Sequence, residues 1–148
     1  MLFTTERWGG FANLDDIDIR LSISIDASSK DVYEKIRRGG NWETLCENME
    51  YISRLRNSSN IKHIKLNFTI QKTNAHQMEA FVEQAKAWNA DRVHFLRLFS
   101  CGTFSPEEFL EQDVFSDNNS LREESKKTLQ KLLNDKNDIN ITMEGLPI

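Results

Sequence analysis

Polar side chains that can bind a ligand follow three apolar segments of the chain. Asp26 ends the first segment, Gln71 with Lys72 and Asn74 closes the second, and Arg97 with the loop 100–103 ends the third. In parallel α/β folds the carboxyl ends of the strands form the ligand-binding edge. Carboxylate, amide and guanidinium groups gathered at that edge suit a sugar, an amino acid or a carboxylate. The alternative is structural, because Asp and Asn often cap the turns that follow strands.

The remaining residues offer little further chemistry. Three histidines stand apart without the spacing of metal ligands, so we expect no metal site; they are His63, His76 and His94. A G-x-S-x-G nucleophile elbow and phosphate-binding glycine loops are absent from the sequence. Gly39 and Gly40 favour a turn before a helix that Asn41 caps, although free amides at that helix start could accept an anion. We therefore expect no catalytic residue in this chain.

Four segments alternate polar and apolar residues at period two, which predicts β-strands. They are residues 18–26, 64–71, 92–98 and 139–143. Helical patterns with apolar stripes separate them, among them residues 42–55 and 78–88. Helix starts are predicted by capping boxes at Ser28 with Asp31, Asn74 with Gln77, Ser105 with Glu108, and Ser120 with Glu123. Alternating strands and helices predict βαβ units and a mainly parallel sheet.

The predicted strands have one apolar and one polar face. In the first strand Leu21 and Ile23 share the apolar face, while Ser22 and Ser24 share the other. Parallel strands covered by helices on both faces read as continuous apolar runs. We therefore expect helices on one face only, and a polar face that lines a barrel lumen or a ligand cleft.

Length and composition limit the class of protein. The 148 residues are enough for one domain, residues 1–148. A net charge of -4 argues against general nucleic-acid binding. The sequence contains no apolar run of the length a membrane helix needs and no secretory signal at its start. Cys46 and Cys101 are the only cysteines, which favours a reducing compartment, so we expect a cytoplasmic protein.

Two stretches of the chain resemble a known enzyme barrel. They are LSISIDASSKDVYEKIRRGGNWETLCENMEYI from Leu21 and IKLNFTIQKTNAHQMEAFVEQAKAWNADRVHFLRL from Ile64. With their S-I-D-A, Y-x-x-I-R-x-G and Q-x-x-N elements, they are similar to the fourth to sixth strands of the radical S-adenosylmethionine (radical SAM) superfamily, over residues 14–102. The resemblance implies the middle and second half of a TIM-like barrel.

In that superfamily the ends of these strands contact the ribose, methionine and adenine parts of the cofactor. The resemblance therefore implies cofactor contacts for Ser24 and Asp26 on the first strand, Gln71 on the second and Leu98 on the third. The superfamily also binds a four-iron cluster through a C-x3-C-x2-C motif, which this chain lacks. We expect no reductive cleavage of S-adenosylmethionine by this chain alone.

The expected fold is an α/β partial barrel. It has about four mainly parallel strands with helices on one face, because a complete (β/α)8 barrel usually needs more than ~200 residues. Residues 14–102 resemble the superfamily, and residues 103–148 add helices and a last strand. Such a half-barrel leaves both sheet edges open for pairing with another chain.

The preferred function hypothesis is a non-catalytic assembly module. It would form a homo-oligomer, most simply a dimer, through open sheet edges or polar sheet faces, without nucleic acid or membrane partners. The alternative is a nucleoside- or S-adenosylmethionine-binding module, or a subunit that completes the barrel of a cluster-bearing radical enzyme. The ligand contacts expected in that case are Ser24, Asp26, Gln71, Asn74, Arg97 and Leu98. A truncated reading frame without a selected role is a third hypothesis.

Overall fold

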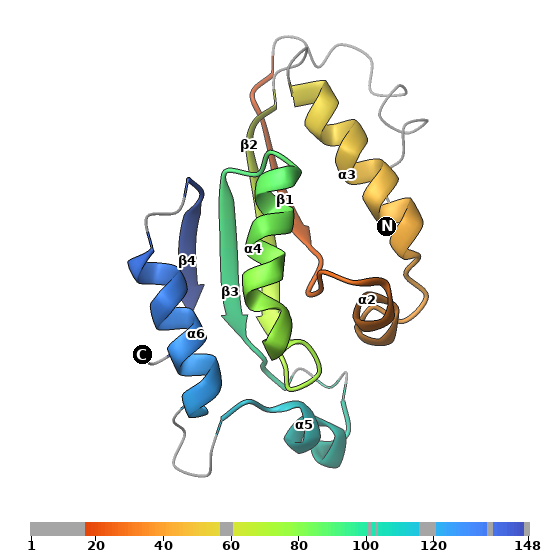
Figure 1. Cartoon of the computed structure of the whole chain (residues 1–148). Coiled ribbons are helices and arrows are strands. Elements are labelled where there is room, and N and C mark those ends of the chain that lie inside the picture. The colour runs from red at the N-terminus through yellow and green to blue at the C-terminus, as the bar shows by residue number, and fades with distance from the viewer. Residues whose placement is uncertain are drawn as a thin grey trace.

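The computed structural model describes residues 17–56, 61–100, 102, 104–115, 121–135 and 138–146. Four strands form one parallel sheet in the order β1-β2-β3-β4. They are β1 (Ile19–Ser24), β2 (Ile61–Ile70), β3 (Arg92–Arg97) and β4 (Asn140–Glu144). The predicted α/β architecture is confirmed as an open sheet, with β1 and β4 as the edge strands of the described part (Figure 1).

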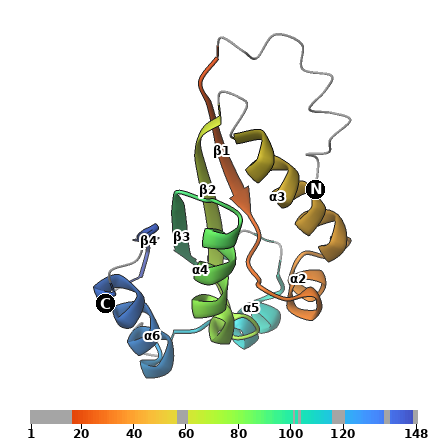
Figure 2. The ribbon, with the colours of Figure 1, turned by 45° about the horizontal axis from the view of Figure 1, so that its top comes forward.

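Helices connect the strands, and the three longest pack on one face of the sheet (Figures 1 and 2). The helices are α2 (Lys30–Ile36), α3 (Trp42–Arg56), the 3-10 turn η1 (Ala75–Gln77), α4 (Met78–Ala87), α5 (Pro106–Gln112) and α6 (Glu123–Asn134). Helices α3, α4 and α6 lie on the same side of the sheet, and α5 lies beyond the carboxyl ends of the strands (Figures 1 and 2). The expected one-sided cover of the sheet is therefore present.

The core lies between the central strands and these helices. Leu66 and Phe68 on β2, and Val93 and Phe95 on β3, are fully buried. The ring of Phe68 packs 4.8 Å from that of Phe81 on α4 and 5.5 Å from that of Phe95, between ring centroids. This apolar layer gives the sheet its helix-covered face, because burial of apolar surface is the main stabilising contribution.

The strand bounds differ slightly from the predicted ones. Strand β1 ends at Ser24, since Asp26 adopts a φ of 66° and begins the following turn. Strand β2 begins earlier than predicted, at Ile61, because its first residues pair with the start of β1 beside a register shift at Ile19. Side-chain alternation alone does not reveal such a shift.

The structure confirms one of the four predicted capping boxes and corrects the others. The Ser105 box is confirmed, with both of its hydrogen bonds and Pro106 in the first turn. The Ser28 box is wrong, because α2 begins after Ser29 and no side chain caps it. The Asn74 box is also wrong, since Asn74 makes no cap hydrogen bond and contacts other strands instead. Ser120 of the fourth box lies outside the described residues, but α6 begins at Glu123 directly after Arg122, with no side-chain cap, so this predicted helix start is also wrong.

Candidate functional site

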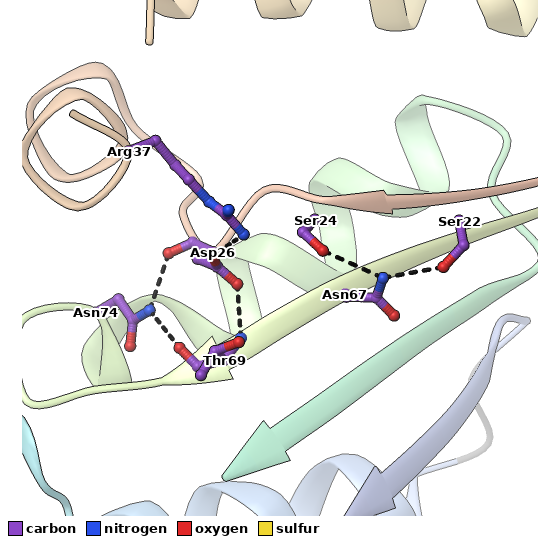
Figure 3. Close-up of polar contacts among 7 residues, drawn as sticks. All are labelled: Ser22, Ser24, Asp26, Arg37, Asn67, Thr69 and Asn74. Atoms are coloured by element: carbon purple, nitrogen blue, oxygen red, sulfur yellow. Dashed lines mark hydrogen bonds and ion pairs between the residues drawn. The ribbon is translucent and has the colours of Figure 1, made fainter. Parts of the chain in front are cut away.

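Asp26 lies at the carboxyl end of β1 and is almost fully buried. Its Oδ1 accepts a hydrogen bond from the Thr69 backbone N–H at 2.7 Å, and its Oδ2 forms an ion pair with Arg37 (Figure 3). Burial raises the pKa of the Asp26 carboxyl above its usual range, although Arg37 and the Thr69 amide favour the charged form. Asp26 therefore links β1, β2 and the end of α2.

Asn74 is completely buried between the ends of the same two strands. Its Nδ2 donates to the backbone oxygens of Asp26 and Thr69, each at 2.9 Å (Figure 3). Its Oδ1 accepts from the Gln71 backbone N–H at 2.7 Å. All three hydrogen bonds join the Asn74 side chain to backbone groups. Asp26 and Asn74 thus have a structural role at the strand ends, and their contact with a cofactor stays a prediction.

Gln77 forms a second link between the two βα units, although the sequence interpretation assigned this residue only to a helix cap. Gln77 Oε1 accepts from the Ser28 backbone N–H at 2.9 Å, and Gln77 Nε2 donates to Ser29 Oγ at 2.7 Å. The β1–α2 loop is therefore tied to the start of α4. Arg37 was also missed as an individual residue, although it stands within the Y-x-x-I-R-x-G element.

Two adjoining clefts lie at the carboxyl ends of β1 and β2. The first has a volume of about 490 Å³, and its lining includes Ser24, Arg37 and Gly39. The second has a volume of about 320 Å³, and its lining includes Gln71. Both clefts share Ile36, Arg38 and Phe104. Two of the six predicted ligand residues, Ser24 and Gln71, are therefore brought to neighbouring concave surfaces.

The charges at these clefts are mostly compensated. Arg37 pairs with Asp26, and Arg38 lies 3.6 Å from a carboxylate oxygen of Glu108 in α5. Arg37 Nε is nevertheless buried without a hydrogen-bond partner in the described part of the chain. This donor belongs to a residue that lines the first cleft, but the Nε atom itself is not exposed to the cleft.

Arg97 and Leu98 are not part of these clefts as described. Arg97 pairs in register with Ile70, and its guanidinium lies over the Phe115 ring at 3.8 Å from the centroid. This geometry is a cation–π contact. Leu98 is buried. The two residues thus belong to the packing beyond the end of β3, and the ligand contacts predicted for them stay untested.

The helix start after the Gly39-Gly40 turn has little capacity left for an anion. Asn41 Oδ1 accepts from the Thr44 N–H at 2.7 Å, as the cap prediction required. Glu34 Oε1 accepts from the Trp42 N–H at 3.2 Å. A carboxylate therefore already stands where an anion would bind, and this arrangement disfavours the anion interpretation of the turn.

The sheet face opposite the helices carries polar side chains from all four strands. Asn67 Nδ2 on β2 donates to Ser22 Oγ at 3.0 Å and to Ser24 Oγ at 3.4 Å on β1 (Figure 3). On the other side of the sheet centre, His94 Nδ1 lies 2.8 Å from Thr142 Oγ1, and its Nε2 lies 3.3 Å from Glu144 Oε2. We call this surface the open face. Its side chains join each edge strand to its neighbour.

Within the part of the chain that the structure describes, no cluster of three or more His, Cys, Asp or Glu side chains could hold a metal ion. His63 Nδ1 lies 3.5 Å from Asp91, and Asp91 also binds Arg56 at 2.5 Å and the Ile64 N–H at 2.8 Å. These contacts are structural, because they tie α3 to the start of β3.

Comparison by sequence finds no match to a protein-family model or to a curated protein. The structure shows a four-stranded parallel α/β sheet and by itself assigns the chain to no family. Among the described residues, no helix combines the length and the apolar character that crossing a membrane requires.

Proposed function

We propose that the chain is a non-catalytic assembly module that pairs with a second copy through the edges of its sheet. The observation that carries this proposal is the open parallel sheet, in the order β1-β2-β3-β4, with the open face on one side. Unpaired strand edges are templates for pairing with another strand. A twofold axis parallel to the strands would place β4 of each copy beside β1 of the other, which closes eight parallel strands.

The burial of the edge strands supports pairing at these positions. The helix-facing side chains of the central strands β2 and β3, such as Leu66 and Phe95, are completely buried. Their counterparts Leu21 and Ile23 on β1, and Met143 on β4, are only partly buried. A neighbouring strand would cover this remaining apolar surface, which is favourable in water.

The direction of the backbone amides identifies the groups that would pair. Ile25 N–H bonds to Asn67 O on β2, so alternate residues of β1, Ser22 and Ser24, direct their N–H groups away from the sheet. Asn140 N–H bonds to Asp91 O at the start of β3, so Ile141 and Met143 on β4 also direct theirs outward. These four amides are available for a partner strand.

A proline substitution on β1 tests this proposal with a matched control. Ser22→Pro removes one outward N–H, and proline is tolerated on an edge strand when its missing donor faces away from the sheet. Ser22→Ala loses the same contact to Asn67 but keeps the N–H. We expect sedimentation to show dimers of twice 17.2 kDa for the wild type and Ser22→Ala, and a folded monomer for Ser22→Pro. A wild-type monomer at every concentration would contradict the proposal.

A second candidate function rests on the two adjoining clefts. Ser24 and Gln71 line them, and these are residues for which the resemblance to the radical SAM superfamily implies contact with S-adenosylmethionine. On this interpretation the chain is a nucleoside-binding module or completes the barrel of a cluster-bearing partner. The presence of only two cysteines, with Cys46 a free thiol, supports a reducing location such as the cytoplasm for either function.

Calorimetric titration with S-adenosylmethionine tests this second candidate. Arg38 lines both clefts and its side chain is 82% exposed, so Arg38→Gln should preserve the fold while it weakens binding of the cofactor carboxylate. Arg54→Gln, on α3 and away from both clefts, is the matched control. Absence of binding to the wild type would exclude a surviving cofactor pocket in the isolated chain.

A further inference from the structure

The amino-terminal half of the open face carries a row of donor side chains across the whole sheet. The strand register places Ser22 beside Lys65, Lys65 beside Arg92, and Arg92 beside Asn140. We call these four residues the basic row. Arg20 lies next to the row on β1, two residues before Ser22, and so faces the same side.

The two cations of this row and the neighbouring Arg20 have no acidic partner in the part of the chain that the structure describes. No ion pair there includes Arg20, Lys65 or Arg92. Asp91 precedes Arg92 but is held by Arg56 and the Ile64 amide. Glu144 lies four residues further along β4 than Asn140, a distance of about 13 Å along the strand.

Two features of the described residues favour an anion beside the basic row. Lys65 and Arg92 occupy directly opposed positions on neighbouring strands, where like charges repel and destabilise a sheet. Arg92 Nε is buried and has no hydrogen-bond partner among the described residues. Buried donors in native proteins are normally satisfied, so an unpaired one indicates a missing acceptor. One oxyanion bound between the Arg92 guanidinium and the Lys65 ammonium would screen this repulsion.

The residues of the row suit recognition of a small anion. A guanidinium group binds phosphate or carboxylate through parallel hydrogen bonds, and an ammonium group adds a second charge. The Ser22 hydroxyl and the Asn140 amide flank these cations as neutral donors. The protein as a whole has a net charge of -4, so attraction of an anion here would depend on these particular cations. Three cations are too few for the extended basic surface of a nucleic-acid binder.

We propose that the basic row of the open face binds an oxyanion, the phosphate or carboxylate group of a small ligand. The site lies within one chain and goes beyond the assembly function, so it does not depend on dimer formation. In a closed dimer the same residues would line the lumen.

Calorimetry with two probes tests this proposal and distinguishes the source of the oxyanion. Inorganic phosphate and succinate are titrated separately, with the ionic strength held constant by chloride. We expect saturable binding of at least one probe, weakened about tenfold or more by Lys65→Gln or Arg92→Gln, because each removes a charge-assisted contact. Binding of one probe alone identifies the preferred group. Absence of saturable binding of both would overturn the proposal.

Control variants distinguish binding at the basic row from a general effect of the protein's charge. Lys127→Gln on α6 and Arg54→Gln on α3 change the net charge by the same amount away from the row. Both should bind the probe like the wild type, and equal weakening in these controls would overturn the proposal. Thermal unfolding gives an independent readout. In chloride alone Lys65→Gln should unfold at a higher temperature than the wild type, since it relieves the repulsion. Addition of the probe should then raise the unfolding temperature of the wild type more than that of Lys65→Gln.

Discussion

Asp26 combines an ordinary turn position with an unusual set of contacts. Its backbone adopts a left-handed φ of 66°, which Asp and Asn tolerate better than most residues. Its carboxylate accepts the Thr69 amide and pairs with Arg37, while its carbonyl accepts from Asn74. The acceptor oxygen is the essential group, because without it the Thr69 N–H would be left unpaired. The charge is less important, since burial raises the pKa of this carboxyl.

Two substitutions at Asp26 separate the acceptor from the charge. Asp26→Asn keeps an oxygen for the Thr69 N–H and tolerates the backbone conformation, so we expect a change in unfolding free energy of less than about 1 kcal/mol. Asp26→Ala leaves that donor without its partner, and we expect a loss of about 1–3 kcal/mol. Urea unfolding measures both values. Equal losses in the two variants would show that the ion pair with Arg37 is the main contribution.

Asp91 gives the fold a dependence on acid pH. Burial alone would raise the pKa of this carboxyl, but Arg56 and the Ile64 amide hold it below its ordinary value of 3.8. A lowered pKa in the folded state means that the contribution to stability is present above the ordinary value and is lost as the pH falls through the folded value. We expect wild-type stability to decrease below about pH 4 more steeply than that of Asp91→Asn. Parallel pH profiles in urea unfolding would contradict this assignment.

Some of these residue roles could be predicted from the sequence and others could not. The position of Asp26 and Asn74 at strand ends followed from the alternation of the strands and from the usual place of Asp and Asn in turns. Their partners could not be predicted, because Thr69 contributes a backbone amide and Gln77 reaches a loop 48 residues away. Such contacts depend on the packing of two βα units against each other.

At the scale of elements, the turn between α2 and α3 is the most constrained connection near the clefts. A Cβ on Gly40 would lie 2.8 Å from Arg37 O and 2.8 Å from Tyr33 Cε1, closer than packed atoms allow. Gly39 has space around it but adopts a φ of +79°, which favours glycine. The sequence indicated a glycine turn here, yet it could not show which glycine is needed for space and which for conformation.

Alanine at each glycine should therefore have a different effect. We expect Gly39→Ala to cost about 1 kcal/mol through backbone strain alone. Gly40→Ala should cost about 1–3 kcal/mol, because Tyr33 and the turn must move apart. Thermal unfolding compares the two variants, and Gly39→Asn serves as a control that restores much of the lost stability. A larger loss for Gly39→Ala than for Gly40→Ala would contradict this interpretation of the turn.

The strands were predictable for a clear physical reason. Each has one face toward the helices and one toward the open side, so its residues alternate regularly along β1, β2 and β4. Strand β3 was ambiguous, because Arg97 follows Val93 and Phe95 on the helix-covered face while Leu96 lies on the open face. The cation–π contact of Arg97 with Phe115 explains how a charged residue occupies that side. Phe115 is 18 residues distant in sequence, so no local pattern could reveal it.

At the scale of the whole molecule, three surfaces of the described part of the sheet bear on the assembly proposal. They are the outer edge of β1, the outer edge of β4 and the open face between them. In a twofold dimer, pairing of the β1 edge with the β4 edge of the partner copy would enclose the open face, with the helices outside.

Site-resolved amide hydrogen exchange at increasing protein concentration tests the central claim most directly. The amides of Ser22, Ser24, Ile141 and Met143 point away from the sheet and would be bonded only in an edge-paired assembly. We predict that these four become protected as the concentration rises, while amides inside the sheet change little. If they exchange equally fast at every concentration, the edges do not pair and the assembly function is wrong.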